Sequence, residues 1–339
     1  MIAEGRPVVD LWGGAATEDG KPWQPDTLVN AFSVGKGVTA ALAARAVAEG
    51  LVDYEDRVNT HWPGFTGGGK ETLTFRGLLA HRGGLPAVRE QLHERAMYEW
   101  DTMTTALAAE TPWWEPGTRH GYHVNTFGFL VGEVLRRATG TGPDGLLDRW
   151  VRGPLGADLW FGVPPEQHTR IADLRWNASP TVPGPTQDLS EEQLMHMNAH
   201  VNPPGLSGVG HVNSAEWRSG EMPSTNLHAS ARGVARLFWS LLDGFVPRAV
   251  IDDAAHEVSN GVDAVLGRNT RFGAGFQLPL PERGFGPNPG AFGHYGAGGS
   301  MGFVDPQAGI AVGYVMNRMG QGWQNPRNRS LLAAVYLAA

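Results

Sequence analysis

The sequence contains no cysteine and very little lysine. Lysine and arginine together number 27 among 339 residues, and the only lysines are Lys21, Lys36 and Lys70. The absence of cysteine excludes disulfide bonds, thiolate metal sites and cysteine nucleophiles. A covalent nucleophile in this chain would therefore be an oxygen atom, and a lysine with a chemical role must be one of three.

Strong positive charge and long apolar runs are also missing. Asp and Glu number 34 against 27 basic residues, which gives a formal net charge of −7. A mildly acidic chain without a basic run lacks the electrostatic footprint of a nucleic-acid-binding protein. No stretch approaches 18 consecutive apolar residues and the first residues show no signal peptide, so we expect a cytoplasmic protein without a membrane span.

The order of the patterns along the chain predicts a large α+β protein. Hydrophobic residues make up 41% of the chain, enough for a large core. Strand patterns lie at 7–14, 272–278, 300–304 and 310–316, and helical patterns lie at 33–50, 127–139, 191–200, 234–242 and 326–337. Strands near both termini with helices between them indicate an antiparallel sheet from both chain ends, flanked by helices.

We divide the chain accordingly into two parts. Residues 1–57 and 230–339 are expected to form an α/β body, and residues 58–229 a mostly helical inserted subdomain. Pro, Gly, Asn and His are dense between about 176 and 226, and this composition predicts a loop-rich cap over a site.

The sharpest chemical feature is the Ser-x-x-Lys pattern formed by Ser33 and Lys36 at the start of the first long helix. One helical turn places the Ser33 hydroxyl and the Lys36 amine on the same face. A serine nucleophile needs a base, and a lysine amine can serve when partial burial lowers its pKa towards neutrality. The helix N-terminus also directs backbone N–H groups at an oxyanion. The alternative is an N-cap serine followed by an ordinary lysine.

Two further segments supply groups that a serine–lysine pair needs. Tyr122 lies in a loop before a helix, where its phenol is placed to pass a proton to a leaving group. His294-Tyr295-Gly296 lies immediately before a strand pattern. Lys36 and His294 can both carry positive charge, so near Tyr122 they would lower the pKa of the phenol and favour phenolate as the base.

In these motifs the chain resembles the serine β-lactamase and penicillin-binding-protein superfamily, most closely its class C-like esterase branch, the family VIII carboxylesterases. The resemblance extends from about residue 8 to the C-terminus and includes the segments 78–86, 223–226 and 302–306. It implies a β-lactamase/D,D-peptidase-like fold and an acyl-enzyme that transfers its acyl group to water or to another acceptor.

The resemblance also implies roles for individual residues. Ser33 corresponds to the nucleophile, Lys36 to its base or base partner, and Tyr122 to the tyrosine that passes the proton to the leaving group. The backbone N–H groups of Ser33 and Ala297 correspond to the oxyanion hole. We therefore expect no cofactor and no metal ion.

Substrate-binding residues are expected in two places. His294-Tyr295-Gly296 stands where β-lactamases carry Lys-Thr-Gly, so we expect it to contact the substrate. Trp113 and Trp217 would form an apolar acyl pocket if they lie near the serine, and the alternative for both is ordinary packing.

Two departures from the family pattern bear on the substrate. Class C β-lactamases carry Tyr-x-Asn, whereas here Asn125 lies three residues after Tyr122 and Val124 takes the usual place. His294 replaces a permanently charged lysine that helps to hold a β-lactam carboxylate. Both departures favour neutral esters over β-lactams.

The sequence therefore predicts a serine hydrolase that cleaves carboxylic esters through an acyl-enzyme on Ser33. The alternatives are an acyltransferase or amide-forming enzyme with the same acyl-enzyme, a β-lactamase or D,D-peptidase, and a binding or regulatory protein without catalysis. The expected partner is a small-molecule ester or acyl donor, with no nucleic acid and no membrane. The resemblance implies a helix and a strand before the strand at residue 8, but only seven residues precede it, so either the sheet is incomplete at that edge or a partner, such as a second copy in a homo-oligomer, or a swapped segment completes it.

Two other patterns have competing interpretations. Ser300 lies in a Gly-x-Ser-x-Gly sequence, but it leads into a strand pattern rather than a helix, so we expect a tight strand entry and no nucleophile. His196 and His200 are spaced for a shared metal ion, but no third ligand stands at the usual spacing, which favours a solvent-facing helix.

Overall fold

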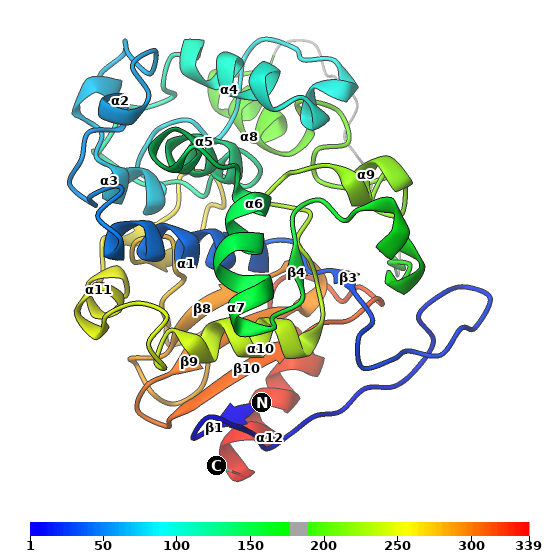
Figure 1. Ribbon diagram of the computed structural model, residues 1–339. Coiled ribbons are helices and arrows are strands. Elements are labelled where there is room, and N and C mark those ends of the chain that lie inside the picture. The colour runs from blue at the N-terminus through cyan, green and yellow to red at the C-terminus, as the bar shows by residue number, and fades with distance from the viewer. Residues whose placement is uncertain (177–188, 339) are drawn as a thin grey trace.

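The computed structural model describes residues 1–176 and 189–338, and it confirms the α+β fold (Figure 1). Its main element is a five-stranded sheet in the order β2-β1-β10-β9-β8, with every neighbouring pair antiparallel. The strands are β1 (Ile2–Ala3), β2 (Arg6–Pro7), β8 (Phe292–Tyr295), β9 (Met301–Asp305) and β10 (Ile310–Tyr314). The first and last parts of the chain therefore build one sheet, as predicted.

Helices cover both faces of this sheet. α1 (Val34–Ala48) and α10 (Ala231–Ser240) pack on one face, and α12 (Pro326–Ala338) packs on the other. Side chains alternate along β9, so Gly302 lies against α10 whereas Phe303 packs with α12. The sheet is therefore buried on both sides, and its two faces contribute to separate apolar clusters.

α1 is buried on almost all of its surface rather than along a single stripe. Its buried residues include Gly35, Gly37 and the segment 40–44, which contains four alanines and one leucine. These small side chains let the sheet approach on one side and α5 (Phe127–Thr139) on the other. The helix that begins after Ser33 is therefore held inside the molecule, as its central place in Figure 1 shows.

Most of the remaining helices lie on the side of α1 away from the sheet (Figure 1). They are α2 (Val58–His61), α3 (Phe75–Leu79), α4 (Trp100–Ala109), α6 (Pro143–Leu147), α8 (Glu191–Val201) and α9 (Ala215–Ser219). The short α7 (Gly153–Leu155) lies beside α10, and α11 (Arg248–Ala254) lies beside α1. The helices predicted at 127–139, 191–200 and 326–337 are confirmed to within one residue at each end. None of the helices in the described ranges has both the length and the apolar character needed to cross a bilayer.

Two smaller sheets carry loops towards the centre of the molecule. β3 (Val29–Asn30), β5 (His228–Ala229) and β4 (Leu159–Trp160) form the first, and β6 (Ser259–Val262) and β7 (Asn269–Phe272) form a hairpin. β3 ends shortly before the start of α1, so this small sheet fixes the entry to that helix.

Two strand predictions are wrong. The segment predicted as a strand at 7–14 leaves the sheet after Pro7, which lacks an N–H to donate, and Leu11 is 84% exposed. The strand predicted at 272–278 ends at Phe272, where the chain turns through glycines that include Gly275 with a φ of +86°. Both segments have the alternation of apolar residues that is typical of a strand, but in the structure a turn of the backbone ends each strand early.

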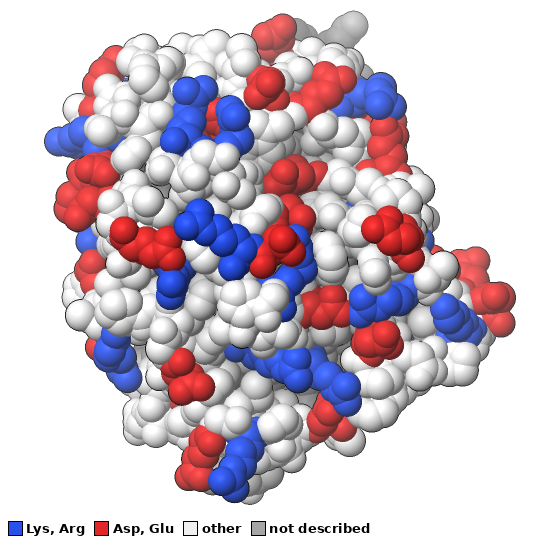
Figure 2. Space-filling model, in the orientation of Figure 1, with Lys and Arg blue, Asp and Glu red and all other residues white. Residues whose placement is uncertain are grey.

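Charged side chains of both signs are interspersed on the face shown in Figure 2. Charged side chains of the described residues form local ion pairs, such as Arg152 with Asp144 at 2.8 Å and Arg76 with Asp253 at 2.9 Å. The second of these pairs joins α3 to α11. No single-sign patch dominates this face.

Gly35 marks the closest approach between α1 and the segment 223–227. A Cβ atom at Gly35 would overlap the carbonyl oxygen of Pro223 and would lie 3.2 Å from the side chains of Leu227 and Phe161. Gly-to-Ala replacement in a helix usually stabilises by about 1 kcal/mol, but this overlap with backbone is expected to reverse the sign. We expect Gly35→Ala to lower the free energy of unfolding by about 1–3 kcal/mol in urea denaturation.

The control for this prediction is Gly64→Ala, because nothing lies within 4 Å of a Cβ atom at Gly64 and its backbone has ordinary dihedral angles. We expect the control to change the free energy of unfolding by less than about 0.5 kcal/mol. A Gly35→Ala protein as stable as the wild type would show that the close approach is not required.

Candidate active site

Ser33 lies at the N-terminus of α1, in the N-cap position. Within the described residues its side chain makes no capping hydrogen bond, and its Oγ lies 3.2 Å from the Nζ of Lys36. The preceding residue, Phe32, has a φ of +50°, a conformation that residues other than glycine rarely adopt outside functional sites. Ser33 is therefore an N-cap residue by position, but its hydroxyl contacts Lys36 instead of capping the helix.

Lys36 is fully buried, and its amine is held by three partners. Besides Ser33 Oγ, its Nζ contacts the carbonyl oxygens of Val124 at 2.6 Å and Ser224 at 3.0 Å. None of these partners is a carboxylate, and burial lowers the pKa of Lys36 well below its usual value. A neutral amine has two N–H donors and one lone pair. In the neutral form, the two N–H groups of Lys36 can donate to the carbonyl oxygens of Val124 and Ser224, and its lone pair can accept from the Ser33 hydroxyl. Ser33 can therefore donate its proton towards Lys36.

Tyr122 faces this pair from the loop before α5. Its side chain is 1% exposed, and the Nζ of Lys36 lies 4.8 Å from the centre of its ring. Its hydroxyl has no hydrogen-bond partner among the residues that the structure describes. Burial raises the pKa of Tyr122 well above its usual value, and the nearby Ser33 hydroxyl opposes that shift.

His294 completes the group from the edge strand β8. Its Nδ1–H donates to the carbonyl oxygen of Tyr295 at 2.7 Å, which leaves Nε2 as an acceptor without a partner in the described part of the chain. Its ring stacks on that of Tyr122 with the centroids 6.0 Å apart. Burial, and then the neighbouring Lys36, lower the pKa of His294 to about 3, so the imidazole is neutral at physiological pH.

The prediction that Lys36 and His294 lower the pKa of Tyr122 is therefore wrong. Burial lowers the pKa of both groups, which weakens the positive charge that either could place beside a phenolate. The same burial raises the pKa of Tyr122. The Lys36 amine, whose pKa is lowered, lies 3.2 Å from Ser33 Oγ, whereas the pKa of the Tyr122 phenol is raised.

The two backbone N–H groups predicted as the oxyanion hole lie in segments that touch. Neither the N–H of Ser33 nor that of Ala297 donates a hydrogen bond to another described residue. Ser300 Oγ donates to the carbonyl oxygen of Ala31 at 2.9 Å, and a Cβ atom at Gly296 would overlap that same oxygen. The turn after β8 is thereby tied to the chain just before α1. Ser300 is fully buried and already bonded, in line with a structural role.

Tyr295 does not join this group, contrary to the prediction from the His294-Tyr295-Gly296 pattern. Successive strand residues point to opposite faces, so Tyr295 points away from the face of His294. Its hydroxyl donates to the carbonyl oxygen of Gly284 at 2.7 Å, and its ring stacks on Phe285 at 4.6 Å in the cluster beneath α12. The Tyr295 side chain is therefore a packing residue.

The two tryptophans predicted to line an acyl pocket have different environments. Trp217 is 0% exposed in the main core, and its indole N–H donates to Asn30 Oδ1 at 3.1 Å, so its role as a pocket wall is wrong. Trp113 is partly exposed, with its indole N–H on the carbonyl oxygen of Ala87 at 2.8 Å and the Arg89 guanidinium 3.6 Å above its ring. A contact between Trp113 and a substrate stays a prediction.

Two aromatic neighbours of Tyr122 were not predicted from the sequence. The ring of Trp323 meets that of Tyr122 edge to face at 5.0 Å and that of His294 at 6.4 Å, and Phe272 stacks on Tyr122 at 5.9 Å. Both residues come from the C-terminal part of the chain, and nothing in their local sequence marks them. Together with His294 they form the aromatic surroundings of the phenol.

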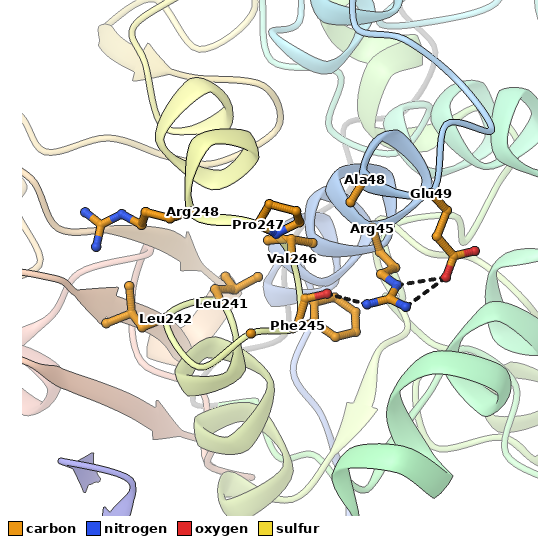
Figure 3. Close-up of a pocket in the computed structure, with 10 residues that line it drawn as sticks. Arg45, Ala48, Glu49, Leu241, Leu242, Phe245, Val246, Pro247 and Arg248 are labelled. Carbon is orange, nitrogen blue, oxygen red and sulfur yellow. Dashed lines mark hydrogen bonds and ion pairs between the residues drawn. The ribbon is translucent and has the colours of Figure 1, made fainter.

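A separate cavity of about 510 Å³ lies at the other end of α1 (Figure 3). Arg45 points along it and is already bonded to the carbonyl oxygen of Phe245 at 2.6 Å and to Glu49 at 2.9 Å. Arg45 lies more than three helical turns from Ser33, which is about 18 Å along the helix. The cavity is therefore distinct from the serine–lysine–tyrosine group.

The described residues contain no cluster of three or more His, Cys, Asp or Glu side chains that could hold a metal ion. The chemistry of the group rests on a serine, a buried lysine and a tyrosine gathered at the N-terminus of α1, beside the edge of an antiparallel sheet. This combination defines a class, the serine hydrolases with a β-lactamase-like fold. The β-lactamase family model matches residues 1–337, and the chain belongs to the β-lactamase family.

Individual relatives include esterases. The esterase/β-lactamase LipL of Mycobacterium tuberculosis is 31% identical over 340 residues, covering 94% of this chain and 76% of that protein. The structure of a family VIII carboxylesterase has a TM-score of 0.89 and 35% identity, covering 98% of this chain and 89% of that one. A penicillin-binding-protein homologue from Caulobacter crescentus has a TM-score of 0.87 and 36% identity, covering 96% and 88%. The predicted family and the hydrolase class are confirmed.

Proposed function

We propose that this protein hydrolyses small, uncharged carboxylic esters through an acyl-enzyme on Ser33. The observation that carries the proposal is the 3.2 Å contact between Ser33 Oγ and the fully buried amine of Lys36. The names of LipL and of the family VIII carboxylesterase, both similar along nearly the whole chain, support an ester as the substrate.

In the acylation step, Lys36 accepts the proton of Ser33 while Oγ attacks the ester carbonyl carbon. The N–H groups of Ser33 and Ala297 donate to the oxyanion that forms. When the carbon–oxygen bond of the ester breaks, the leaving alkoxide takes a proton from the Tyr122 hydroxyl, and the ammonium group of Lys36 returns a proton to Tyr122. The products are an alcohol and the acylated Ser33.

In the deacylation step, a water molecule gives a proton to the Lys36 amine and attacks the acyl carbon. The carbon–oxygen bond to Ser33 breaks, Ser33 Oγ regains its proton, and a carboxylic acid leaves. Because Lys36 and Tyr122 are buried, their proton transfers are shielded from bulk water. The cycle uses no group beyond the chain, the ester and water.

The environment of His294 supports an uncharged substrate. The imidazole is neutral and buried, and its Nε2 lone pair has no partner among the described residues, so His294 adds no positive charge beside Ser33 and Tyr122. A carboxylate at this place would meet a lone pair instead of a cation, which disfavours β-lactams and peptides with a free carboxylate. Neutral esters avoid that conflict.

A burst experiment tests the proposal. With p-nitrophenyl butyrate, we expect a burst of p-nitrophenol equivalent to the amount of enzyme, followed by steady turnover in water alone. Turnover that appears only after an alcohol or an amine is added would identify a transferase instead. A larger kcat/KM for nitrocefin than for the ester would contradict the substrate class.

A further inference from the structure

The backbone around Tyr122 is held at three successive N–H groups. The N–H of Gly121 donates to the carbonyl oxygen of His81 at 3.1 Å, and the N–H of His123 donates to His81 Nδ1 at 3.1 Å. Between them, the N–H of Tyr122 donates to both carboxylate oxygens of Asp263, at 2.9 Å and 3.0 Å. Asp263 is thus the charged acceptor in this series.

Asp263 is fully buried in the turn between β6 and β7. Its other donors are the backbone N–H groups of Val265 and Leu266 and the hydroxyl of Thr270, each at 2.9 Å. No arginine or lysine forms an ion pair with it among the described residues, so backbone and hydroxyl donors supply all of its hydrogen bonds. Because these donors come from the tyrosine loop, from the turn and from β7, they fix the orientation of the carboxylate.

The hairpin and the tyrosine loop are fitted closely to each other. A Cβ atom at Gly121 would overlap the Trp114 ring and would lie tightly, at 3.1–3.2 Å, against the side chains of Val265 and Ala264, so the glycine allows this close approach. The N–H of Ala264 donates to the carbonyl oxygen of His120 at 3.0 Å, and the ring of His120 bonds to the Thr270 hydroxyl at 2.9 Å. The hairpin therefore holds the loop at His120, at Gly121 and at the Tyr122 N–H.

The phenol side chain of Tyr122 is not held by a hydrogen bond of this kind. Its hydroxyl has no partner in the described chain, so its position depends on the backbone and on the rings that pack against it. On the far side of the loop, the carbonyl oxygen of Val124 binds Lys36 at 2.6 Å. A shift of this backbone would move the phenol and a partner of Lys36 together.

We propose that Asp263 is a positioning residue for Tyr122, which places the phenol beside Ser33 by holding the Tyr122 N–H with both carboxylate oxygens. The inference rests on the proposed function, because it acts through the proton transfer assigned to Tyr122. A displacement of about 1 Å in a reacting group can cost about 100-fold in rate. Loss of this anchor therefore lowers the rate of the chemical steps more than substrate binding.

The test begins with Asp263→Asn, which puts an amide NH₂ against the Tyr122 N–H or the Thr270 hydroxyl. We expect kcat for p-nitrophenyl butyrate to fall about 10- to 100-fold, with KM within about 3-fold of the wild type. Asp305→Asn is the matched control, because Asp305 is equally buried and accepts from two backbone N–H groups, an amide and a hydroxyl. The control is expected to lose stability without this fall in kcat.

A double-mutant cycle with Tyr122→Phe separates positioning from a general structural effect. If Asp263 acts through the phenol, Asp263→Asn causes no further loss of kcat in the Tyr122→Phe background. An equal loss in both backgrounds, or an unchanged kcat in the single variant, would overturn the inference. If Asp263→Asn does not fold, Thr270→Val, which removes one donor to Asp263, is expected to show a smaller loss with the same dependence on Tyr122.

The outcome for Tyr122→Phe alone distinguishes the two proposals. A Tyr122→Phe protein with wild-type kcat would remove the proton transfer from the proposed function, and the inference with it. A strongly impaired Tyr122→Phe protein together with an unaffected Asp263→Asn protein would overturn the positioning role only.

Discussion

Ser33→Ala is expected to lower kcat for a neutral p-nitrophenyl ester by about 10³-fold or more, because no other hydroxyl among the described residues is hydrogen-bonded to the Lys36 amine and could form the acyl-enzyme. The fold should persist, because the Ser33 side chain caps no helix N–H in the described structure and its loss leaves no buried donor there. Steady-state kinetics and thermal unfolding of the purified variant give the two measurements.

Two further serine variants make this result specific. Ser190→Ala removes the N-cap of α8, whose hydroxyl accepts from the N–H of Gln193, and is expected to leave kcat unchanged. Ser300→Ala tests the other serine in a motif context. Loss of the acyl-enzyme burst in Ser300→Ala, with the burst retained in Ser33→Ala, would assign the nucleophile to Ser300 and refute the account.

Lys36→Arg is expected to be almost as damaging, with a loss of about 10²- to 10⁴-fold in kcat. A guanidinium keeps its proton at any physiological pH, so it cannot accept one from Ser33. Lys70→Arg is the matched control, since Lys70 is also buried and donates to backbone carbonyl oxygens, including that of Glu110 at 3.0 Å. We expect it to change stability and to leave kcat near the wild-type value.

The pH dependence of the wild type follows from the same amine. Burial lowers the pKa of Lys36, and only the neutral amine is a base, so kcat/KM should fall as the pH drops through that lowered pKa. His294→Gln should leave this fall in kcat/KM at low pH (the acid limb of the pH profile) in place, because burial has already lowered the pKa of His294 to about 3. Loss of the limb in His294→Gln, or its persistence in Lys36→Arg, would contradict the assignment of Lys36.

Local patterns predicted the parts of the site that lie within one element. Ser33 and Lys36 are one helical turn apart, so their contact follows from helix geometry once the helix is recognised. The bounds of α5 follow in the same way from apolar spacing. The strand β8 was missed because its four residues include a glycine and a histidine, and it is a strand only because it pairs with β9.

Contacts between distant segments could not be predicted. Asp263 meets the Tyr122 N–H across 141 positions of the chain, and the Trp323 ring reaches the same phenol from still further away. Burial is a property of the whole fold as well. It reversed the predicted pKa shift of Tyr122 and placed Trp217 in the core.

The most direct measurement of the central claim is mass spectrometry of the protein after reaction with a serine-reactive phosphonate. The account predicts one adduct per chain, located by peptide mapping on Ser33, and no adduct in Ser33→Ala. An adduct on another residue, or ester hydrolysis that continues in a protein fully labelled at Ser33, would contradict it.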